Sequence, residues 1–329
     1  MSTLPSSSIP IFITVAEYRG WRRKAFAENK SVGFVPTMGA LHDGHLSLVR
    51  RSLAENDLTV LSIFVNPAQF SPHEDLTTYP RTLERDLEVL AEQNVAMKQP
   101  SAVFLPSVKE MYPGGIHQDV SQQRGTFVEV KGFGEQMEGK SRPTFFRGVA
   151  TVVTKLFNAI EPTNAYFGEK DIQQAFLLRR MVTDLLLSHP SPDHVHIVPT
   201  VRDASDNLAL SSRNAYLSTS GRKVAPTLYA SLQVAQGYWA NGGSKSECIN
   251  AATSFVQQRV EEAKAQGLDV NMKLDYIEMN QVRDFEVVDD DATRHLREED
   301  PIILSGALWV DKTRLIDNIL LGAQALKYK

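Results

Sequence analysis

Short apolar runs alternate with stretches of helical periodicity over roughly the first 200 residues. Residues 31–36 (SVGFVP) and 58–65 (LTVLSIFV) are nearly continuous apolar runs, a pattern typical of parallel strands buried on both faces. Residues 45–56 lie between them and place apolar side chains at helical spacing. A strand, a loop, a helix and a second strand in this order predict a βαβ unit.

The same alternation continues toward residue 199. Because strands that alternate with helices form mostly parallel sheets, the pattern predicts an α/β domain whose sheet is covered on both faces. The further elements are helices at 79–94, 148–162 and 172–187, and strands at 102–106, 126–130 and 195–201, while 165–171 is predicted to be a strand that runs into a loop.

The pattern changes after residue 199, so we expect one domain over 1–199 and a smaller α+β domain over 200–329. Two long helices are predicted, separated by Asn-Gly-Gly-Ser, and strands follow them. Their ranges are 221–240 and 245–266 for the helices, and 274–279, 301–310 and 314–321 for the strands. The segments 113–125 and 287–300 are polar and are expected to be exposed loops.

Composition narrows the class of protein. The chain has 329 residues, of which 42% are hydrophobic and 22% charged, as in ordinary globular proteins. Its formal net charge of −4 gives no overall field that would attract nucleic acid or a membrane surface. The single cysteine, Cys248, excludes an intramolecular disulfide framework and favours a reducing compartment. The first 20 residues lack a signal-peptide pattern, and no apolar run is long enough to span a bilayer, so we expect a cytoplasmic protein.

The first segment with candidate chemistry is 37–45, TMGALHDGH, between a predicted strand and a predicted helix. Ligands of open α/β sheets bind at the carboxyl ends of strands, and a helix N-terminus there favours phosphate. Gly39 and Gly44 would let the backbone approach a ligand, and His42 and His45 could both donate to one phosphate. The segment is also compatible with a helix-capping loop, or with a zinc pair for which no third ligand is evident.

The second segment, 64–70 (FVNPAQF), directly follows the second predicted strand, which puts it at the same sheet edge. Asn66 and Gln69 offer uncharged donors and acceptors that could hold the hydroxyl or carboxylate of a small substrate. A strand that ends at Pro67 in a polar turn is the alternative.

The third segment, 167–174, is FGEKDIQQ. Gly168 permits close approach of a ligand, Lys170 could neutralise phosphate charge, and Asp171 could contact a ribose or lie near Mg²⁺. Gln174 lies about one helical turn beyond Asp171 and could point toward the same ligand. A capped helix start with a solvated charged run is the alternative.

Two further segments carry hydroxyl and guanidinium groups. Ser211, Ser212 and Arg213, just beyond the domain boundary, suit triphosphate oxygens because arginine presents a fork of donors. Arg142 and Arg147 could meet a carboxylate or phosphate. A polar turn and a basic surface loop are the respective alternatives.

Together and in this order, these segments resemble the pantothenate synthetase family. The resemblance spans about residues 33–217, while H-x-G-H alone would indicate only the broader nucleotidyltransferase superfamily. It is carried by PTMGALHDGHLSLVR, SIFVNPAQF, EDLTTYPRTLERD, VFLPSVKEMYP, TVVTKLFN, FGEKDIQQ and LALSSRNAYL.

The resemblance implies a Rossmann-like N-terminal domain, a smaller C-terminal domain that closes over the ATP site, Mg²⁺-ATP and a homodimer. It implies that pantoate is activated as its adenylate and then joined to β-alanine. The catalytic residues would be His45, His42, Lys170 and Arg213. Gln69, Gln174, Asn66 and Arg142 would bind the substrates. ATP would be bound by Met38, Gly39, His42, Gly44, His45, Gly168, Glu169, Lys170, Asp171, Val201, Leu210, Ser211, Ser212 and Arg213.

One position departs from the family pattern. The family commonly has R-P-x-H-F where this chain has Arg142-Pro143-Thr144-Phe145-Phe146. Phe145 cannot donate to a phosphate or carboxylate, so the role of that histidine does not transfer. Two alternatives follow: another H-x-G-H nucleotidyltransferase, and an inactive nucleotide-binding protein, which Phe145 favours and the presence of His42, His45, Lys170 and Arg213 opposes.

Overall fold

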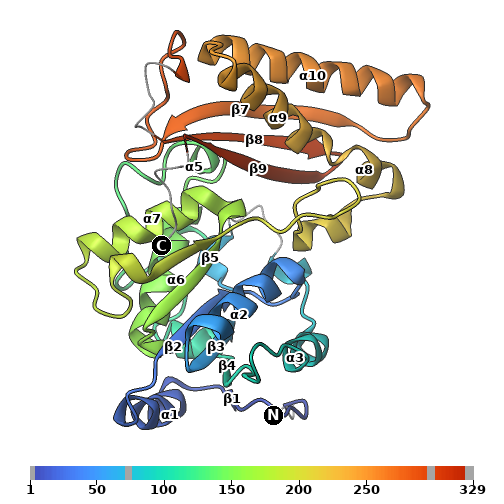
Figure 1. The fold of residues 1–329 in the computed structure, drawn as a ribbon. Helices are drawn as coiled ribbons and strands as arrows, with labels where there is room; N and C mark the ends of the chain where they lie inside the picture. The colour runs from blue at the N-terminus through green and yellow to red at the C-terminus, as the bar shows by residue number, and fades with distance from the viewer. Residues whose placement is uncertain (1–3, 71–75, 295–300, 323–329) are drawn as a thin grey trace. The chain divides into compact units, whose positions relative to one another are not determined.

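The computed structural model describes residues 4–70, 76–294 and 301–322. They form two compact units (Figure 1). The first unit contains the described residues up to Glu169 together with Gln173–Pro199. The second contains Lys170–Ile172 and the described residues from Thr200 onward.

A six-stranded parallel sheet, in the order β1-β4-β3-β2-β5-β6, forms the centre of the first unit. This confirms the predicted α/β class. The chain runs outward from β2 to β3 and β4, and then returns to the other side of β2 with β5 and β6, so the strand order reverses between β2 and β5. Such a switch point is where ligands bind in open α/β sheets. The strands are β1 (Ile11–Phe12), β2 (Val32–Thr37), β3 (Leu58–Ile63), β4 (Ala102–Phe104), β5 (Asn164–Gly168) and β6 (Val195–Val198).

Helices cover both faces of this sheet, which explains why its strands are nearly continuous apolar runs. Val35 and neighbouring side chains pack with α2 and α3 in one buried cluster. Phe34 points to the opposite face, where its ring lies 6.4 Å from that of Phe157 on α6. The helices are α1 (Val15–Ala27), α2 (Asp43–Glu55), α3 (Leu83–Ala91), α4 (Val108–Met111), α5 (Glu138–Ser141), α6 (Phe145–Ile160) and α7 (Ile172–Asp184).

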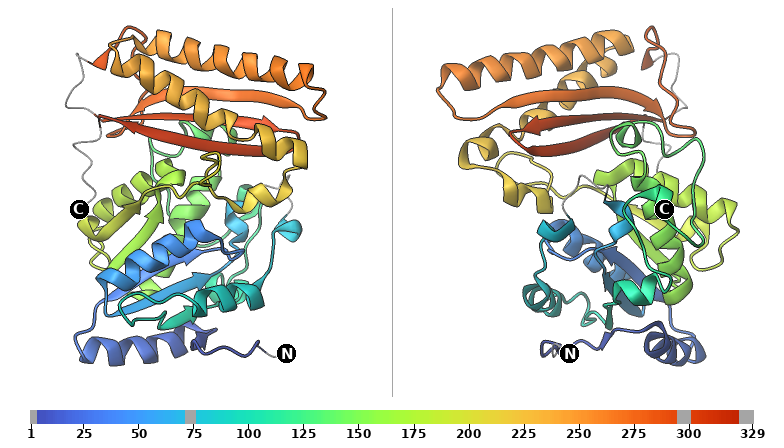
Figure 2. Two further views of the ribbon diagram at one scale, coloured as in Figure 1. Left: turned by 45° about the vertical axis from the view of Figure 1, so that its right-hand side comes forward. Right: turned by 180° about the vertical axis from the view of Figure 1, so that it is seen from behind.

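The second unit is a three-stranded antiparallel sheet, β7-β8-β9, with helices packed on one face (Figure 2). Leu228 and Leu232 of α9 meet Leu304 and Leu308 of β8 in its buried core. This is the smaller α+β architecture that the sequence predicts. The elements are α8 (Thr219–Val224), α9 (Thr227–Ala240), α10 (Lys245–Ala265), β7 (Met272–Gln281), β8 (Ile302–Val310) and β9 (Thr313–Leu321).

Three local predictions differ from the structure. The strand predicted at 126–130 is wrong, because this segment pairs with no strand and Val128 donates instead to the Thr151 hydroxyl (3.0 Å). The helix predicted over 221–240 is divided at Pro226, which has no backbone N–H to continue the helical ladder. Helix α1 was missed because Arg22 occupies one of its inward positions, where it donates to the carbonyl of Glu161.

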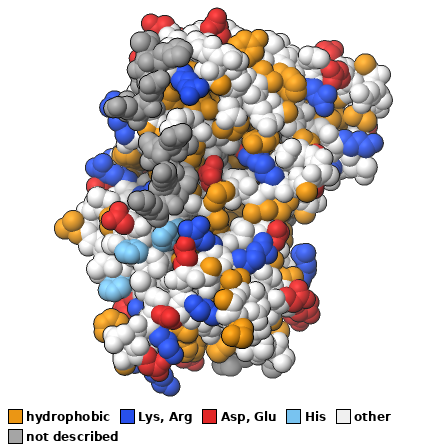
Figure 3. Space-filling model, viewed as in Figure 1, with side chains coloured by type: hydrophobic (Ala, Val, Ile, Leu, Met, Phe, Trp, Pro, Cys, Tyr) orange, Lys and Arg blue, Asp and Glu red, His pale blue; other side chains and the backbone are white. Residues whose placement is uncertain are grey.

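The charge distribution on the surface and the polarity of the helices agree with the expectations from composition. Acidic and basic side chains are interspersed over the face shown in Figure 3. Among the described residues, no helix combines the length and the apolar character needed to cross a bilayer. The segment 113–125 is irregular apart from one short 3₁₀ turn, as expected for a loop. Of the loop predicted at 287–300, the last six residues lie outside the described part of the chain.

Candidate active site

A buried carboxylate fixes the loop that follows β2. Asp86 of α3 is 1% exposed, and its two oxygens accept the backbone N–H groups of Ala40 (2.9 Å) and Leu41 (2.8 Å). Gly39 adopts φ +84°, a conformation that favours glycine, and a Cβ there would meet an Asp86 oxygen at 3.1 Å. The path of the chain into α2 is therefore set by one charged acceptor on a neighbouring helix.

His42 and His45 stand at the start of α2 with their ring centroids 4.1 Å apart. His42 Nδ1 accepts the backbone N–H of Gly44 (3.1 Å), and His45 Nδ1 accepts that of His42 (3.4 Å). A neutral imidazole that accepts through Nδ1 carries its proton on Nε2. The capping arrangement thus gives both rings the Nε2–H tautomer, so that each ring carries an N–H donor at a helix N-terminus.

The segment after β3 is organised by Asn66, which is 1% exposed. Its Oδ1 accepts from the Tyr112 hydroxyl (2.7 Å) and the Ala68 N–H (3.3 Å). Its Nδ2 donates to Gln69 Oε1 (3.0 Å) and to the Gly148 carbonyl (3.1 Å). All four hydrogen-bonding positions of this amide are used within the chain. The structure therefore joins Asn66 directly to Gln69, and the expected contact between Asn66 and a substrate stays a prediction.

Helix α6 approaches this segment closely because residue 148 is glycine. A Cβ at Gly148 would lie 2.1 Å from the carbonyl oxygen of Ala68, nearer than side chains ever pack. The close approach also brings the Gly148 carbonyl within reach of Asn66. Gln69 itself is half-buried.

Arg142 and Phe145 show what the departure from the family pattern does locally. The Arg142 guanidinium carbon lies 3.9 Å from the centre of the Phe145 ring, and Nη2 donates to the Gln69 carbonyl (3.0 Å). Arg147 lies over Phe127 in the same way, at 4.0 Å, and bonds to Gln123. Phe145 therefore supports an arginine that holds the backbone of Gln69.

The third predicted segment follows β5. Glu169–Asp171 form a 3₁₀ turn that leads into α7. A Cβ at Gly168 would meet nothing within 4 Å, so there is open space beside this residue. Of the two glutamines on α7, Gln173 is buried and bonds to the backbone of 133–138, whereas Gln174 is half-buried.

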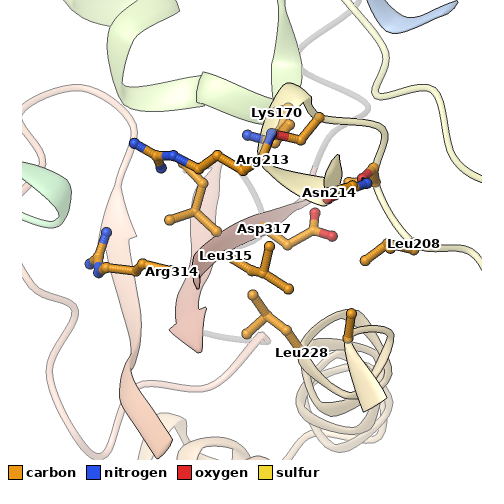
Figure 4. A pocket seen from close by; sticks show the side chains of 12 residues that line it. Lys170, Leu208, Arg213, Asn214, Leu228, Arg314, Leu315 and Asp317 are labelled. Atoms are coloured by element: carbon orange, nitrogen blue, oxygen red, sulfur yellow. The ribbon is translucent and has the colours of Figure 1, made fainter. Parts of the chain in front are cut away.

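In the second unit, Lys170 and Arg213 line a small pocket together with Ser211 and Asn214 (Figure 4). In this view the two cationic side chains lie on one side, with Leu228 and Leu315 opposite them. Ser211 caps the 3₁₀ turn Ser212–Tyr216, its hydroxyl accepting the N–H of Arg213 (3.3 Å). The turn fixes where the Arg213 side chain begins.

Two charged residues of this pocket already have partners. Asp317 forms a bidentate ion pair with Arg202 (2.7 and 2.8 Å), and Arg314 pairs with Asp275 (2.8 Å). No acidic partner of Arg213 is found within the described part of the chain. Arg213 is therefore the cation of this pocket best suited to an anionic ligand, and Lys170, whose Nζ lies 3.8 Å from Asp171 Oδ1, lines the same pocket.

Residues 200–210 form a hairpin that leads into this pocket. Leu210 donates to the carbonyl of Val201 (3.0 Å), and Asp203 donates to that of Leu208 (2.8 Å). Met38 lies in the loop after β2, Gly44 in the first turn of α2 and Ser212 in the 3₁₀ turn that follows Ser211.

Three residues with evident influence on these groups were missed by the sequence reasoning. They are Asp86, which holds the loop after β2; Tyr112, which bonds to Asn66; and Asn318 of β9, whose Nδ2 donates to the Lys170 carbonyl (3.0 Å). The sequence could have revealed Asp86, because it lies on the apolar face of α3 with Leu83, Leu87 and Leu90. A carboxylate on such a face is stable only if it has buried hydrogen-bond partners. No such pattern indicates Tyr112 or Asn318.

Comparison with known proteins places the chain in a family. A family model described as pantoate-beta-alanine ligase matches residues 10–320. The chain is 42% identical to pantoate–beta-alanine ligase of Saccharomyces cerevisiae, over 94% of this chain and 99% of that protein. It is 44% identical to pantothenate synthetase of Thermotoga neapolitana, over 95% of this chain and 99% of that protein.

Solved structures agree. Pantothenate synthetase of Thermus thermophilus superposes with a TM-score of 0.76 at 40% identity, covering 94% of this chain and 99% of that one. Pantoate-beta-alanine ligase of Francisella tularensis, solved in complex with beta-gamma ATP and beta-alanine, gives 0.67 at 31% identity, covering 95% and 98%. With the loop of two histidines, the Asn66–Gln69 segment and the Lys170–Arg213 pocket in place, the chain belongs to the pantoate–beta-alanine ligase family.

Proposed function

We propose that this chain condenses pantoate with β-alanine to pantothenate, using ATP and releasing AMP and pyrophosphate. The observation that carries the proposal is the pair of Nε2–H tautomers at the start of α2, which provides two N–H donors at a helix N-terminus, where a phosphate binds best. The complex of the Francisella relative with beta-gamma ATP and beta-alanine supports ATP and β-alanine as two of the substrates.

The first step activates a carboxylate that an amine could not attack directly, since its oxide is a poor leaving group. One carboxylate oxygen of pantoate forms a bond to the α-phosphorus of ATP. The bond from that phosphorus to the bridging oxygen breaks, and pyrophosphate leaves with the electron pair. His42 and His45 donate to the oxygens on which negative charge develops, His45 being the principal transition-state donor, and Lys170 and Arg213 offset the triphosphate charge.

The second step forms the amide. The neutral amine of β-alanine bonds to the acyl carbon of pantoyl adenylate, the bond from that carbon to the AMP oxygen breaks, and the amine loses a proton. No covalent bond to the protein is required. Exclusion of water would protect the adenylate between the two steps.

Substrate binding is assigned as follows. Gln69 and Gln174 hold pantoate, Gln69 also lies near β-alanine, and Arg142 supports Gln69 through its carbonyl. Residues of both units are assigned to ATP binding on the family resemblance. The assigned nucleotide-binding residues are Met38, Gly39, His42, Gly44, His45, Gly168, Glu169, Lys170, Asp171, Val201, Leu210, Ser211, Ser212 and Arg213.

Mg²⁺ is part of the proposal as the partner of ATP. Among the described residues, no cluster of three or more His, Cys, Asp or Glu side chains could hold a metal by itself. Asp171 is exposed beside Lys170, with Oδ1 and Nζ 3.8 Å apart. One carboxylate, phosphate oxygens and water form a donor set that suits Mg²⁺. Asp171 would be its protein ligand, and the bound ion would neutralise phosphate charge.

A homodimer and a cytoplasmic location complete the proposal. The homodimer rests on the family resemblance. The cytoplasm rests on the single cysteine, Cys248, whose burial raises the pKa of its thiol to about 11 and keeps it in the unreactive protonated form.

The proposal is tested with purified protein, Mg²⁺-ATP, pantoate and β-alanine, followed by mass spectrometry. We expect equal amounts of AMP and pantothenate, and protein-bound pantoyl adenylate when β-alanine is omitted. Formation of a nucleotide-linked product that persists in the presence of β-alanine would instead identify another nucleotidyltransferase activity.

A further inference from the structure

We infer that Tyr112 is a positioning residue for substrate binding: through its hydrogen bond to Asn66, it holds the Asn66 and Gln69 amides firmly in the orientation that the backbone around Asn66 sets. This inference rests on the proposed role of Gln69 in binding pantoate. Tyr112 is 4% exposed and bonds to the oxygen of the Asn66 amide, whose nitrogen bonds to Gln69, so we expect it to act through Asn66 and not by contact with a substrate.

The orientation of the Asn66 amide is fixed by backbone groups that cannot exchange roles. The Ala68 N–H can only donate, so it requires the oxygen of Asn66 on its side. The Gly148 carbonyl can only accept, so it requires the nitrogen. A flipped amide would oppose like groups at both places.

The orientation of Gln69 follows from that of Asn66. The second N–H of Asn66 Nδ2 donates to Gln69 Oε1 (3.0 Å). With its oxygen held in this way, Gln69 directs its Nε2 donors away from Asn66. Two N–H donors suit the carboxylate or hydroxyl oxygens of pantoate, whereas a carbonyl oxygen in their place would repel the carboxylate.

Tyr112 completes this series of hydrogen bonds, because its hydroxyl donates to the remaining lone pair of Asn66 Oδ1 (2.7 Å). Burial raises the pKa of Tyr112 well above its usual value, which keeps the hydroxyl protonated and able to donate. The Lys155 ammonium lies 4.1 Å from the centre of the Tyr112 ring and donates to the Met111 carbonyl (2.7 Å). These contacts hold the ring, and so the direction of its hydroxyl.

Tyr112→Phe tests the inference because it removes only the hydroxyl. We expect the KM for pantoate to rise about fivefold, the effect of one neutral hydrogen bond, with the KM for ATP unchanged. Tyr166→Phe is the matched control: it also removes a buried hydroxyl in the first unit, one bonded to Asn56 and Glu55, and both KM values should stay at wild type. Equal rises in the two KM values of Tyr112→Phe would indicate general loss of structure and overturn the inference.

A double-mutant cycle with Gln69→Ala separates this inference from the proposed function. If Tyr112 acts through Gln69, Tyr112→Phe adds nothing to the pantoate KM of Gln69→Ala. The same fivefold rise in both backgrounds would overturn the inference and leave the role of Gln69 intact. A wild-type pantoate KM for Gln69→Ala would overturn the role of Gln69, and the inference with it.

Asn66→Asp provides a second variant if Tyr112→Phe folds poorly. The carboxylate still accepts from Tyr112 and Ala68 but cannot donate, so Gln69 must turn and present its oxygen to the substrate. We expect a larger rise in the pantoate KM than for Tyr112→Phe, again with the ATP KM preserved. A pantoate KM within twofold of wild type would overturn the inference.

Discussion

The loops that follow β2 and β3 lie at the same edge of the parallel sheet, yet they are held by different chemistry. The loop after β2 is fixed through its backbone, because the Asp86 carboxylate accepts two of its N–H groups. The loop after β3 is fixed through side chains, by the neutral amide of Asn66 and the stacked Arg142. Each loop presents a group that the proposed function assigns to a different substrate.

This difference predicts which substitutions should displace each loop. A charge-assisted hydrogen bond contributes about twice as much as a neutral one, so the loop of His42 and His45 depends on one residue, Asp86. The loop of Gln69 depends on several weaker contacts, and no single one should account for its position. Substitutions that displace the loop after β2 should lower kcat and weaken ATP binding. Substitutions that displace the loop after β3 should weaken pantoate binding.

The largest effect is expected for His45→Ala, which removes the imidazole N–H that we propose as the principal transition-state donor. Loss of one well-placed transition-state donor should lower kcat about 10²- to 10³-fold. Steady-state kinetics with all substrates saturating measures it. His189→Ala, an exposed histidine of the same unit, is the control and should retain wild-type kcat. A near-wild-type kcat for His45→Ala would remove its assigned role.

Asp86→Asn should destabilise the loop after β2, because it alters the side chain that accepts two backbone N–H groups of this loop. The amide keeps one acceptor but sets an N–H₂ group against the second backbone N–H, so we expect a loss of about 2–3 kcal/mol in the free energy of unfolding and a higher KM for ATP. Chemical denaturation and kinetics provide the two readouts. Asp184→Asn, which breaks an exposed ion pair with Arg180, should change stability by less than about 1 kcal/mol. Equal effects of the two variants would contradict the account.

Gly148→Ala should displace the second loop. Its new methyl group would meet the Ala68 carbonyl at 2.1 Å, so α6 and the Asn66–Gln69 segment must separate, at a cost of about 1–3 kcal/mol of stability. The KM for pantoate should rise while that for ATP stays constant. Gly20→Ala in α1 is the control, since its Cβ would meet nothing within 4 Å and should stabilise the helix. An unchanged pantoate KM would show that this contact does not position Gln69.

Phe145→Ala should have the smallest effect. A partly exposed cation–π contact contributes about 0.5–1 kcal/mol, so release of Arg142 should raise the pantoate KM about 2- to 5-fold. Phe127→Ala removes the equivalent contact from Arg147, which bonds to Gln123, and should leave this KM unchanged. A similar response of the two variants would mean that Phe145 does not act through Arg142.

Much of the fold could be predicted because the strands of the first unit are buried on both faces, which leaves apolar runs such as 58–65 that are hard to mistake. Helix α1 could not, since Arg22 interrupts its apolar face. The strand expected at 126–130 failed because alternation does not reveal whether a neighbouring strand exists to pair with it.

The residues of the candidate site also fall into two groups, those that could be predicted from the sequence and those that could not. Groups that follow strands directly, such as His45 and Gln69, can be found from the sequence because parallel strands end at one edge. Residues that act through another residue cannot, since their partners are distant in the chain. Tyr112 is 46 positions from Asn66, and Asn318 is 148 from Lys170. For the same reason the sequence does not reveal that the Asn66 amide makes four hydrogen bonds within the chain.

The central claim, that the chain forms an amide through an acyl adenylate, is tested most directly with pantoate labelled with heavy oxygen in both carboxylate positions. The two proposed steps transfer one labelled oxygen to AMP and leave the other in the amide of pantothenate. Mass spectrometry should therefore find one label in each product. Unlabelled AMP, or ADP with labelled phosphate, would contradict the account.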